Sequence, residues 1–123
     1  MKSFLTLVCL CVCVPIFSQT VEIPDKNFEQ ALIDLHIDSD GIVNGLILKS
    51  DAQLVTSLDV SSKKIKDLTG IEAFTSLMYL NCRNNKLSNL DVSQNIGLIT
   101  LSTNVNHLIA NRNSMNLLNW FDE

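Results

Sequence analysis

The chain has few of the residues that break or stiffen a fold, with 2 prolines, 4 glycines and 6% aromatic residues among 123. Such small numbers of proline and glycine exclude collagen-like and low-complexity chains. Basic residues are also scarce, at 9 Lys and Arg against 13 Asp and Glu. This deficit of positive charge argues against nucleic acid or an anionic membrane as the partner. The 46% of hydrophobic residues can supply the slim core of one domain.

Long hydrophobic runs are absent except at the start of the chain. The opening segment, "MKSFLTLVCLCVCVPIFSQT", has a basic residue at Lys2, an apolar run from about Phe4 to Phe17, and the small residue Ser18. This order is typical of a secretory signal peptide, which we expect at residues 1–19. The run is short for a membrane span, which needs about 20 apolar residues.

Cleavage of residues 1–19 would remove three of the 4 cysteines and leave Cys82 alone. One cysteine can form neither an intramolecular disulfide nor a cysteine-based metal site. The charge would then be 8 basic minus 13 acidic residues, or -5. We therefore expect no cofactor, no nucleic-acid partner and no membrane span in the cleaved chain.

A repeated spacing fills the middle of the chain. The segment "LMYLNCRNNKL" begins at Leu77 and places Leu, Leu, Cys, Asn and Leu at fixed intervals. The segment "LITLSTNVNHL" repeats the frame from Leu98, a displacement of 98 minus 77, or 21 residues. The segment "VTSLDVSSKKI" repeats it from Val55, a displacement of 77 minus 55, or 22. A shorter echo, "LSNLDVSQN", recurs at half the period. The pattern and its period are those of leucine-rich repeats.

Elementary geometry explains the pattern. Side chains alternate along a strand, so Leu80 and Cys82 point inward while their neighbours face solvent. The following asparagine suits a tight turn, and stacked coils align such amides into a ladder for buried backbone groups. This ladder would consist of Lys63, Asn85 and Asn106, with its first rung missing. The sequence predicts an α/β solenoid, a leucine-rich repeat right-handed coil with parallel β strands over residues 54–108.

An N-terminal cap is expected at residues 20–53. A helix that starts near Pro24 and Asp25 is predicted by apolar residues at i, i+3, i+4 and i+7, namely Phe28, Ala31, Leu32 and Leu35. One helix cannot bury its apolar stripe alone, so we expect a capping helix across the open edge of the first coil. The turn signal Asn44-Gly45, between "IV" and "LIL", predicts a turn or a small hairpin.

The repeat frame fails after Leu108. The segment at 109–123 has no leucine at the required spacing and then gathers Leu117, Leu118, Trp120 and Phe121. It is either a short C-terminal cap or the remainder of a longer array that is cut or shifted out of frame. About two and a half coils fall short of the roughly three that confer independent stability. We expect marginal folding, and the exposed C-terminal coil offers a surface for self-association.

These segments resemble the N-terminal part of secreted bacterial leucine-rich repeat proteins, broadly internalin-like. The resemblance covers residues 22–108 and is carried by "IPDKNFEQALIDL", "DSDGIVNG", "VTSLDVS", "DLTGIEAFTSLMYLNC" and "NNKLSNLDVSQN". It implies a secreted or cell-surface location, binding of a protein or glycan, and no catalytic residues. The alternative is a truncated remnant of a longer surface protein with little function of its own.

The outward strand positions are the candidate binding face. Across three coils they form three rows, which are Ser57, Tyr79, Thr100; Asp59, Asn81, Ser102; and Ser61, Arg83, Asn104. Parallel strands would bring each row together at a spacing of about 4.8 Å. Tyrosine and arginine are enriched at binding hot spots.

Three other groups of residues favour structural interpretations. Cys82 occupies a core position and His107 a solvent position, so a nucleophile and base pair is disfavoured. Asp38, Asp40 and Asn44 suggest a calcium loop, but an alignment on Gly41 fails at both ends, and a solvated turn is favoured. The lysines at 63, 64 and 66 are interpreted as another solvated turn.

Overall fold

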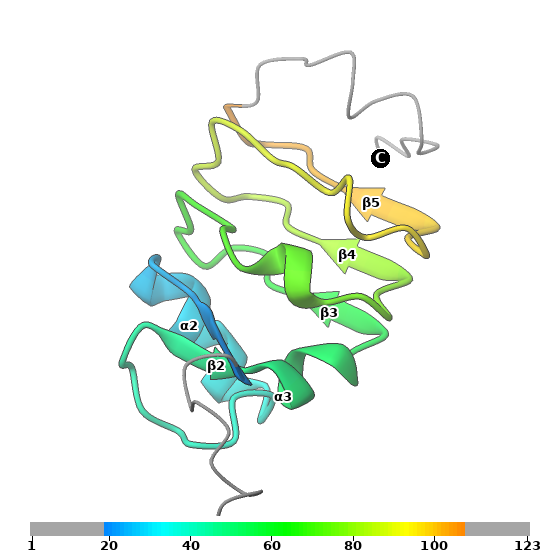
Figure 1. Ribbon diagram of the computed structural model, residues 1–123. Helices are drawn as coiled ribbons and strands as arrows, with labels where there is room; N and C mark the ends of the chain where they lie inside the picture. The colour runs from blue at the N-terminus through cyan, green and yellow to red at the C-terminus, as the bar shows by residue number, and fades with distance from the viewer. Residues whose placement is uncertain (1–18, 108–123) are drawn as a thin grey trace, which may run out of the picture.

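A computed structural model describes residues 19–107, and Figure 1 shows its elements stacked from the N-terminal end upward. No helix within 19–107 is both long and apolar enough to cross a membrane. The predicted signal peptide, Leu108 and the tail at 109–123 lie outside the described residues. The elements in chain order are β1 (Thr20–Glu22), α2 (Lys26–Asp34), β2 (Leu46–Leu48), α3 (Lys49–Gln53), β3 (Ser57–Asp59), the 3-10 helix η2 (Ile71–Ala73), β4 (Tyr79–Asn81) and β5 (Thr100–Ser102).

The repeats form one parallel sheet in the order β3-β4-β5. Leu58 pairs with Leu80 and Leu80 with Leu101, so equivalent residues differ by 22 and 21 positions (80 minus 58, 101 minus 80). Parallel neighbours need a crossover connection, and each coil supplies one on its return side. The predicted leucine-rich repeat solenoid with parallel strands is therefore confirmed for the described coils.

The interior is filled by the apolar positions of the repeat. Leu77, Leu80, Cys82 and Leu87 are fully buried, as the alternation predicted. Leu101 is also fully buried in the next coil. The core is continuous along the stack, because each inward row lies on the row of the preceding coil.

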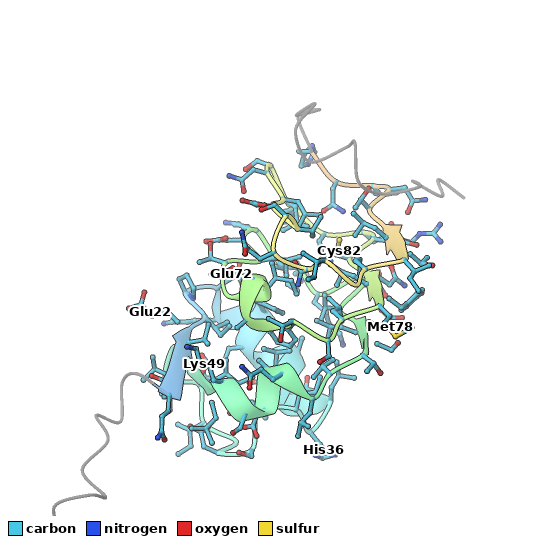
Figure 2. All side chains as sticks on the ribbon, turned by 45° about the vertical axis from the view of Figure 1, so that its right-hand side comes forward. Glu22, His36, Lys49, Glu72, Met78 and Cys82 are labelled. Carbon is cyan, nitrogen blue, oxygen red and sulfur yellow. The ribbon has the colours of Figure 1, made fainter. Side chains whose placement is uncertain are left out.

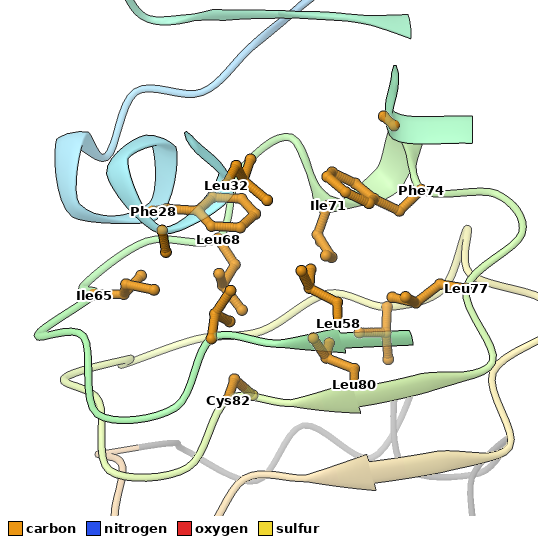
Figure 3. Packing of buried hydrophobic residues seen from close by; sticks show 14 of the residues in the cluster. Phe28, Leu32, Leu58, Ile65, Leu68, Ile71, Phe74, Leu77, Leu80 and Cys82 are labelled. Atoms are coloured by element: carbon orange, nitrogen blue, oxygen red, sulfur yellow. The ribbon is translucent and has the colours of Figure 1, made fainter. Parts of the chain in front are cut away.

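Helix α2 shares this core. Phe28 and Leu32 are fully buried, and Figure 3 shows them facing Ile71 and Phe74 of the first coil. The rings of Phe28 and Phe74 pack with centroids 6.3 Å apart. The predicted helix is present, although Leu35 at the end of its apolar stripe is 44% exposed.

The ends of α2 are fixed by specific hydrogen bonds. Asp25 is the N-cap, and its Oδ1 accepts hydrogen bonds from the backbone N–H groups of Asn27 and Phe28. Its Oδ2 accepts from the backbone N–H groups of Lys66 and Asp67, which ties the helix to the first coil. At the other end His36 adopts a left-handed conformation with φ 58° and closes the helix.

The asparagine ladder is present in two of its three positions. The Oδ1 atom of Asn85 accepts hydrogen bonds from the N–H groups of Lys63 and Ile65, and its Nδ2 donates to Val60 O and Cys82 O. These bonds serve groups that stacking hides from water. The side chain of Lys63 is exposed, so the first rung is missing, as predicted.

Asn106 repeats the arrangement one coil later. Its Nδ2 donates to Cys82 O at 2.8 Å and to Thr103 O at 2.7 Å, while its Oδ1 accepts from Leu87 N–H. Asn106 therefore occupies the same structural position as Asn85.

The half-period echo has its own buried amide. Asn95 is 3% exposed, and its Nδ2 donates to Ile71 O at 2.9 Å and Phe74 O at 3.0 Å. Val92 and Leu98 are buried on either side of it. The echo is thus a second set of inward positions on the return side of the coil.

Of the turn or hairpin predicted at Asn44-Gly45, the turn is present and the hairpin is not. The strand β2 exists, but its antiparallel partner is β1, with Val21 paired to Ile47. Gly45 does lie in a turn with φ +82°. The segment before it is instead held by the α2 side chain Glu29, which accepts hydrogen bonds from the N–H groups of Asn44 and Gly45.

Candidate functional site

The first two rows of the candidate binding face are in register. Tyr79 pairs with Ser57 and Thr100 on its two sides. Asn81 likewise pairs with Asp59 and Ser102. Since their neighbours in each strand are buried, these six side chains share the outer face of the sheet.

The third row lies just beyond the strands and keeps the same register. Backbone hydrogen bonds run from Ser62 N–H to Arg83 O at 2.9 Å and from Asn84 N–H to Asn104 O at 3.1 Å. Arg83 and Asn104 are half-buried, as is Ser61. All nine predicted residues therefore belong to three adjacent coils.

The centre of the face is held by side-chain hydrogen bonds. Asn81 Nδ2 donates to Asp59 Oδ2 at 3.2 Å, and the Ser61 hydroxyl donates to Asp59 Oδ1 at 2.7 Å. Burial raises the pKa of Asp59, but these bonds and the charge of Lys63 outweigh it and hold the pKa below its ordinary value. Asp59 is thus a fixed negative charge on a polar surface.

The face also has an apolar margin that was not predicted from the sequence. Met78 and Ile99 precede β4 and β5, are 47% and 61% exposed, and lie in adjacent coils, where Ile99 N–H donates to Met78 O at 2.8 Å. Figure 2 labels Met78 beside the strands. The sequence did contain a sign of this margin, because an apolar residue stands at the same repeat position in two coils, directly before Tyr79 and directly before Thr100.

Cys82 and His107 do not form a catalytic pair. The Cys82 thiol is buried and donates to Ser102 O at 3.4 Å, whereas His107 is exposed. Burial raises the pKa of the thiol to about 12. Since the thiolate is the nucleophile, burial keeps this cysteine in its less reactive thiol form.

The acidic loop at 38–44 has its oxygens engaged internally. Asp40 accepts from Ile42 N–H and from the side chain of Asn44, at 2.8 and 2.9 Å. Glu29, fully buried and not foreseen from the sequence, uses both oxygens on the same loop. Within residues 19–107 no group of three metal-binding side chains is present.

Asp38 is the exception in this loop, because it is 4% exposed and its Oδ2 has no hydrogen-bond partner within residues 19–107. Burial, followed by the nearby charge of Asp40, raises the pKa of Asp38 to about 6. The carboxyl group of Asp38 is therefore harder to ionise than an exposed one, because it is buried.

No protein-family model matches the chain. A segment of 48 residues, 37% of the chain, is 48% identical to internalin J of Listeria monocytogenes, serotype 4b strain F2365. That segment spans 5% of the length of internalin J.

Solved structures resemble the chain over a longer stretch. The functional domain of InlJ from Listeria monocytogenes, which includes a cysteine ladder, has 30% identity and a TM-score of 0.68 over 84% of this chain and 23% of its own. The internalin InlF of the same species has a TM-score of 0.64 over 72% of this chain and 26% of its own. At 24% identity, that second match concerns the fold alone.

A third structure comes from another genus. It contains the CBM51-2 and INT domains of Clostridium perfringens ZmpB and matches at 29% identity with a TM-score of 0.56, over 67% of this chain and 17% of its own. The chain thus corresponds to a small part of each of these larger proteins.

The sequence match and the first structural match concern the same protein, internalin J, and the parallel sheet of this chain has the leucine-rich repeat register. The chain is an internalin-like leucine-rich repeat protein of the kind found in bacteria.

Proposed function

We propose that the chain is a non-catalytic binding module, exported to the cell surface or secreted, that recognises a protein or glycan through the face defined by its nine outward residues. One observation carries the proposal. The face combines a fixed polar centre at Asp59 and Asn81 with an apolar margin at Met78 and Ile99. Binding surfaces commonly join apolar contact area to oriented hydrogen-bonding groups.

Tyr79 is the residue expected to contribute most. It lies half-buried between the polar centre and Met78, where an aromatic ring loses little conformational freedom on binding. Arg83, in the third row, adds a planar group that can bind carboxylates or stack on rings. The relatives support a surface role, since internalins match the chain in sequence and in structure.

Two further assignments support this function. We infer that α2, with β1 and β2, is the N-terminal cap of the solenoid, since its buried side chains cover the first coil. We also infer a right-handed coil, because crossovers between parallel strands are right-handed in nearly all proteins.

A paired substitution tests the binding face. Tyr79→Ala combined with Arg83→Ala is expected to reduce binding about tenfold or more to whatever component of a glycan array or cell-surface protein array retains the chain. The control is Lys49→Ala combined with Glu72→Ala, two exposed positions outside the face. Equal binding by both double variants, with unchanged circular dichroism, would contradict the proposal.

The alternative of a remnant with little independent function predicts a different result. A remnant would unfold non-cooperatively or associate, whereas a module should unfold as a cooperative monomer. Thermal unfolding followed by circular dichroism, with sedimentation to give the mass, separates the two.

A further inference from the structure

Basic side chains are concentrated on one side of an acidic chain. Residues 19–107 contain seven Lys and Arg, and five of them lie on the two turns after β3 and β4, namely Lys63, Lys64, Lys66, Arg83 and Lys86. No acidic residue occurs at 60–66, 82–90 or 103–107. Figure 1 shows the turns that follow the three strands stacked on one another at one side of the solenoid, above α2.

Three basic side chains occupy equivalent positions on successive coils. Lys64, Lys86 and His107 differ by 22 and 21 residues (86 minus 64, 107 minus 86), the same offsets as the paired strands. Backbone hydrogen bonds hold this register, from Lys86 N–H to Ile65 O at 2.7 Å and from His107 N–H to Leu87 O at 2.8 Å. All three side chains are exposed. We name them the basic column.

The column continues toward α2. The side chain of Asn27 donates to Lys64 O at 3.1 Å, so the first turn of the helix lies against the base of the column. Lys26, the first residue of α2, is exposed beside it in the chain. The nearby carboxylate of Asp25 already accepts four backbone N–H groups.

The positive charges of Lys64 and Lys86, stacked on successive coils, repel each other. Adjacent strands lie about 4.8 Å apart, and like charges directly opposite one another destabilise a sheet. The lysines of the column form no salt bridge with any residue in 19–107. An anion lying along the column would remove this repulsion.

The surroundings indicate which kind of anion. No large apolar side chain is exposed at 62–66 or 84–86, and at 103–107 one is, Val105, at 69%. Stable protein interfaces are centred on clusters of aromatic or apolar anchors, and a single valine at the last turn of the column does not form such a cluster. Lysines on flexible stems suit a chain of repeated charges that is bound by electrostatics.

We propose that the basic column binds an acidic polysaccharide, one bearing sulfate or carboxylate groups along an extended chain. The column lies on the turns, separate from Tyr79 and the polar centre of the binding face. It therefore adds a second contact surface, which would hold the chain on a polyanionic coat independently of the first ligand.

Heparin, a sulfated polysaccharide, is the probe, and neutral dextran is the negative control. The purified chain should bind heparin with an affinity that falls as salt rises. Lys86→Gln should weaken binding about fivefold, the order for one basic residue near an anionic surface. It should also lower the slope of log affinity against log salt by about one. His107→Lys should strengthen binding, and Tyr79→Ala should leave it unchanged.

Lys49→Gln is the matched control, since it removes one exposed lysine of α3 and changes the net charge equally. Equal weakening by Lys49→Gln and Lys86→Gln would show that only the net charge matters and would overturn the assignment. An absence of heparin binding at low salt would also overturn it. Equally tight binding of poly-glutamate, with the same response to the variants, would replace the polysaccharide by an acidic peptide.

Discussion

The Oδ1 atom of Asn85 lies 3.0 Å from the backbone nitrogen of Lys63, its counterpart one coil earlier. Lys63 has no side-chain amide of its own at this ladder position, and its backbone N–H donates to the amide of Asn85 instead. The missing first rung does not break the ladder, because each amide acts on the coil before it.

Asn85→Ala should strongly destabilise the chain. The substitution leaves the buried N–H of Ile65 and the carbonyls of Val60 and Cys82 without their side-chain partner. Each unsatisfied buried group costs about 1–3 kcal/mol, so a total of about 3 kcal/mol is expected. Urea unfolding measures the loss, and Asn89→Ala, at an exposed position, is the control. A loss below about 1 kcal/mol would mean that water replaces the amide.

Gly70→Ala should be among the most damaging small substitutions. Gly70 has φ +106°, and a Cβ there would overlap Ile23 Cδ1 and lie 2.7 Å from Glu22 O. Left-handed strain adds about 1–2 kcal/mol and overpacking about 1–3 kcal/mol. The expected result is a drop in melting temperature of about 10 °C or more. Gly97→Ala, whose nearest contact would be ordinary at 3.6 Å, should change the melting temperature little.

Asp38 should make the fold more stable as the pH is lowered. Its pKa is raised in the folded state from 3.8 to about 6, so the penalty for its ionisation appears between about pH 4 and 6 and is complete above. Asp38→Asn should therefore stabilise the chain at pH 7.5 by up to about 3 kcal/mol, and the advantage should vanish near pH 4. The free energy of unfolding is measured for the wild-type chain and for Asp38→Asn between about pH 4 and 7.5. Subtracting one from the other removes the contribution of the other carboxylates, which both chains share. An advantage that is independent of pH would contradict the explanation.

Cys82 should react with alkylating agents only when the chain opens. With its pKa at about 12, the thiol carries almost no thiolate near pH 8. Labelling by iodoacetamide, followed by mass spectrometry at Cys82, should be at least about 100-fold slower in buffer than in guanidinium chloride. Rapid labelling of the native chain would restore the possibility of a reactive cysteine.

Short-range periodicity explains what could be predicted from the sequence. The inward placement of Leu80 and Cys82 follows from alternation within one strand. The role of Asn85 follows from a fixed position in a repeat. Both properties are local, so they can be recognised in a single sequence.

The features that were missed depend on partners distant in the chain. Glu29 is a polar residue beside an apolar stripe, and its partners at Asn44 and Gly45 are 15 and 16 residues away. The strand at Thr20–Glu22 is too short to display a period, and its partner is β2, beyond α2. Met78 and Ile99 were overlooked because they lie just before β4 and β5, where strand alternation does not yet apply.

The asparagine ladder also gives the array a direction. Asn85 hydrogen bonds to the coil before it, and Asn106 does the same one coil later. The turn of each coil is completed only when the following coil arrives. Each added coil therefore supplies the amide that completes the backbone hydrogen bonds of the coil before it, so removal of a coil would leave the preceding turn without that side-chain partner.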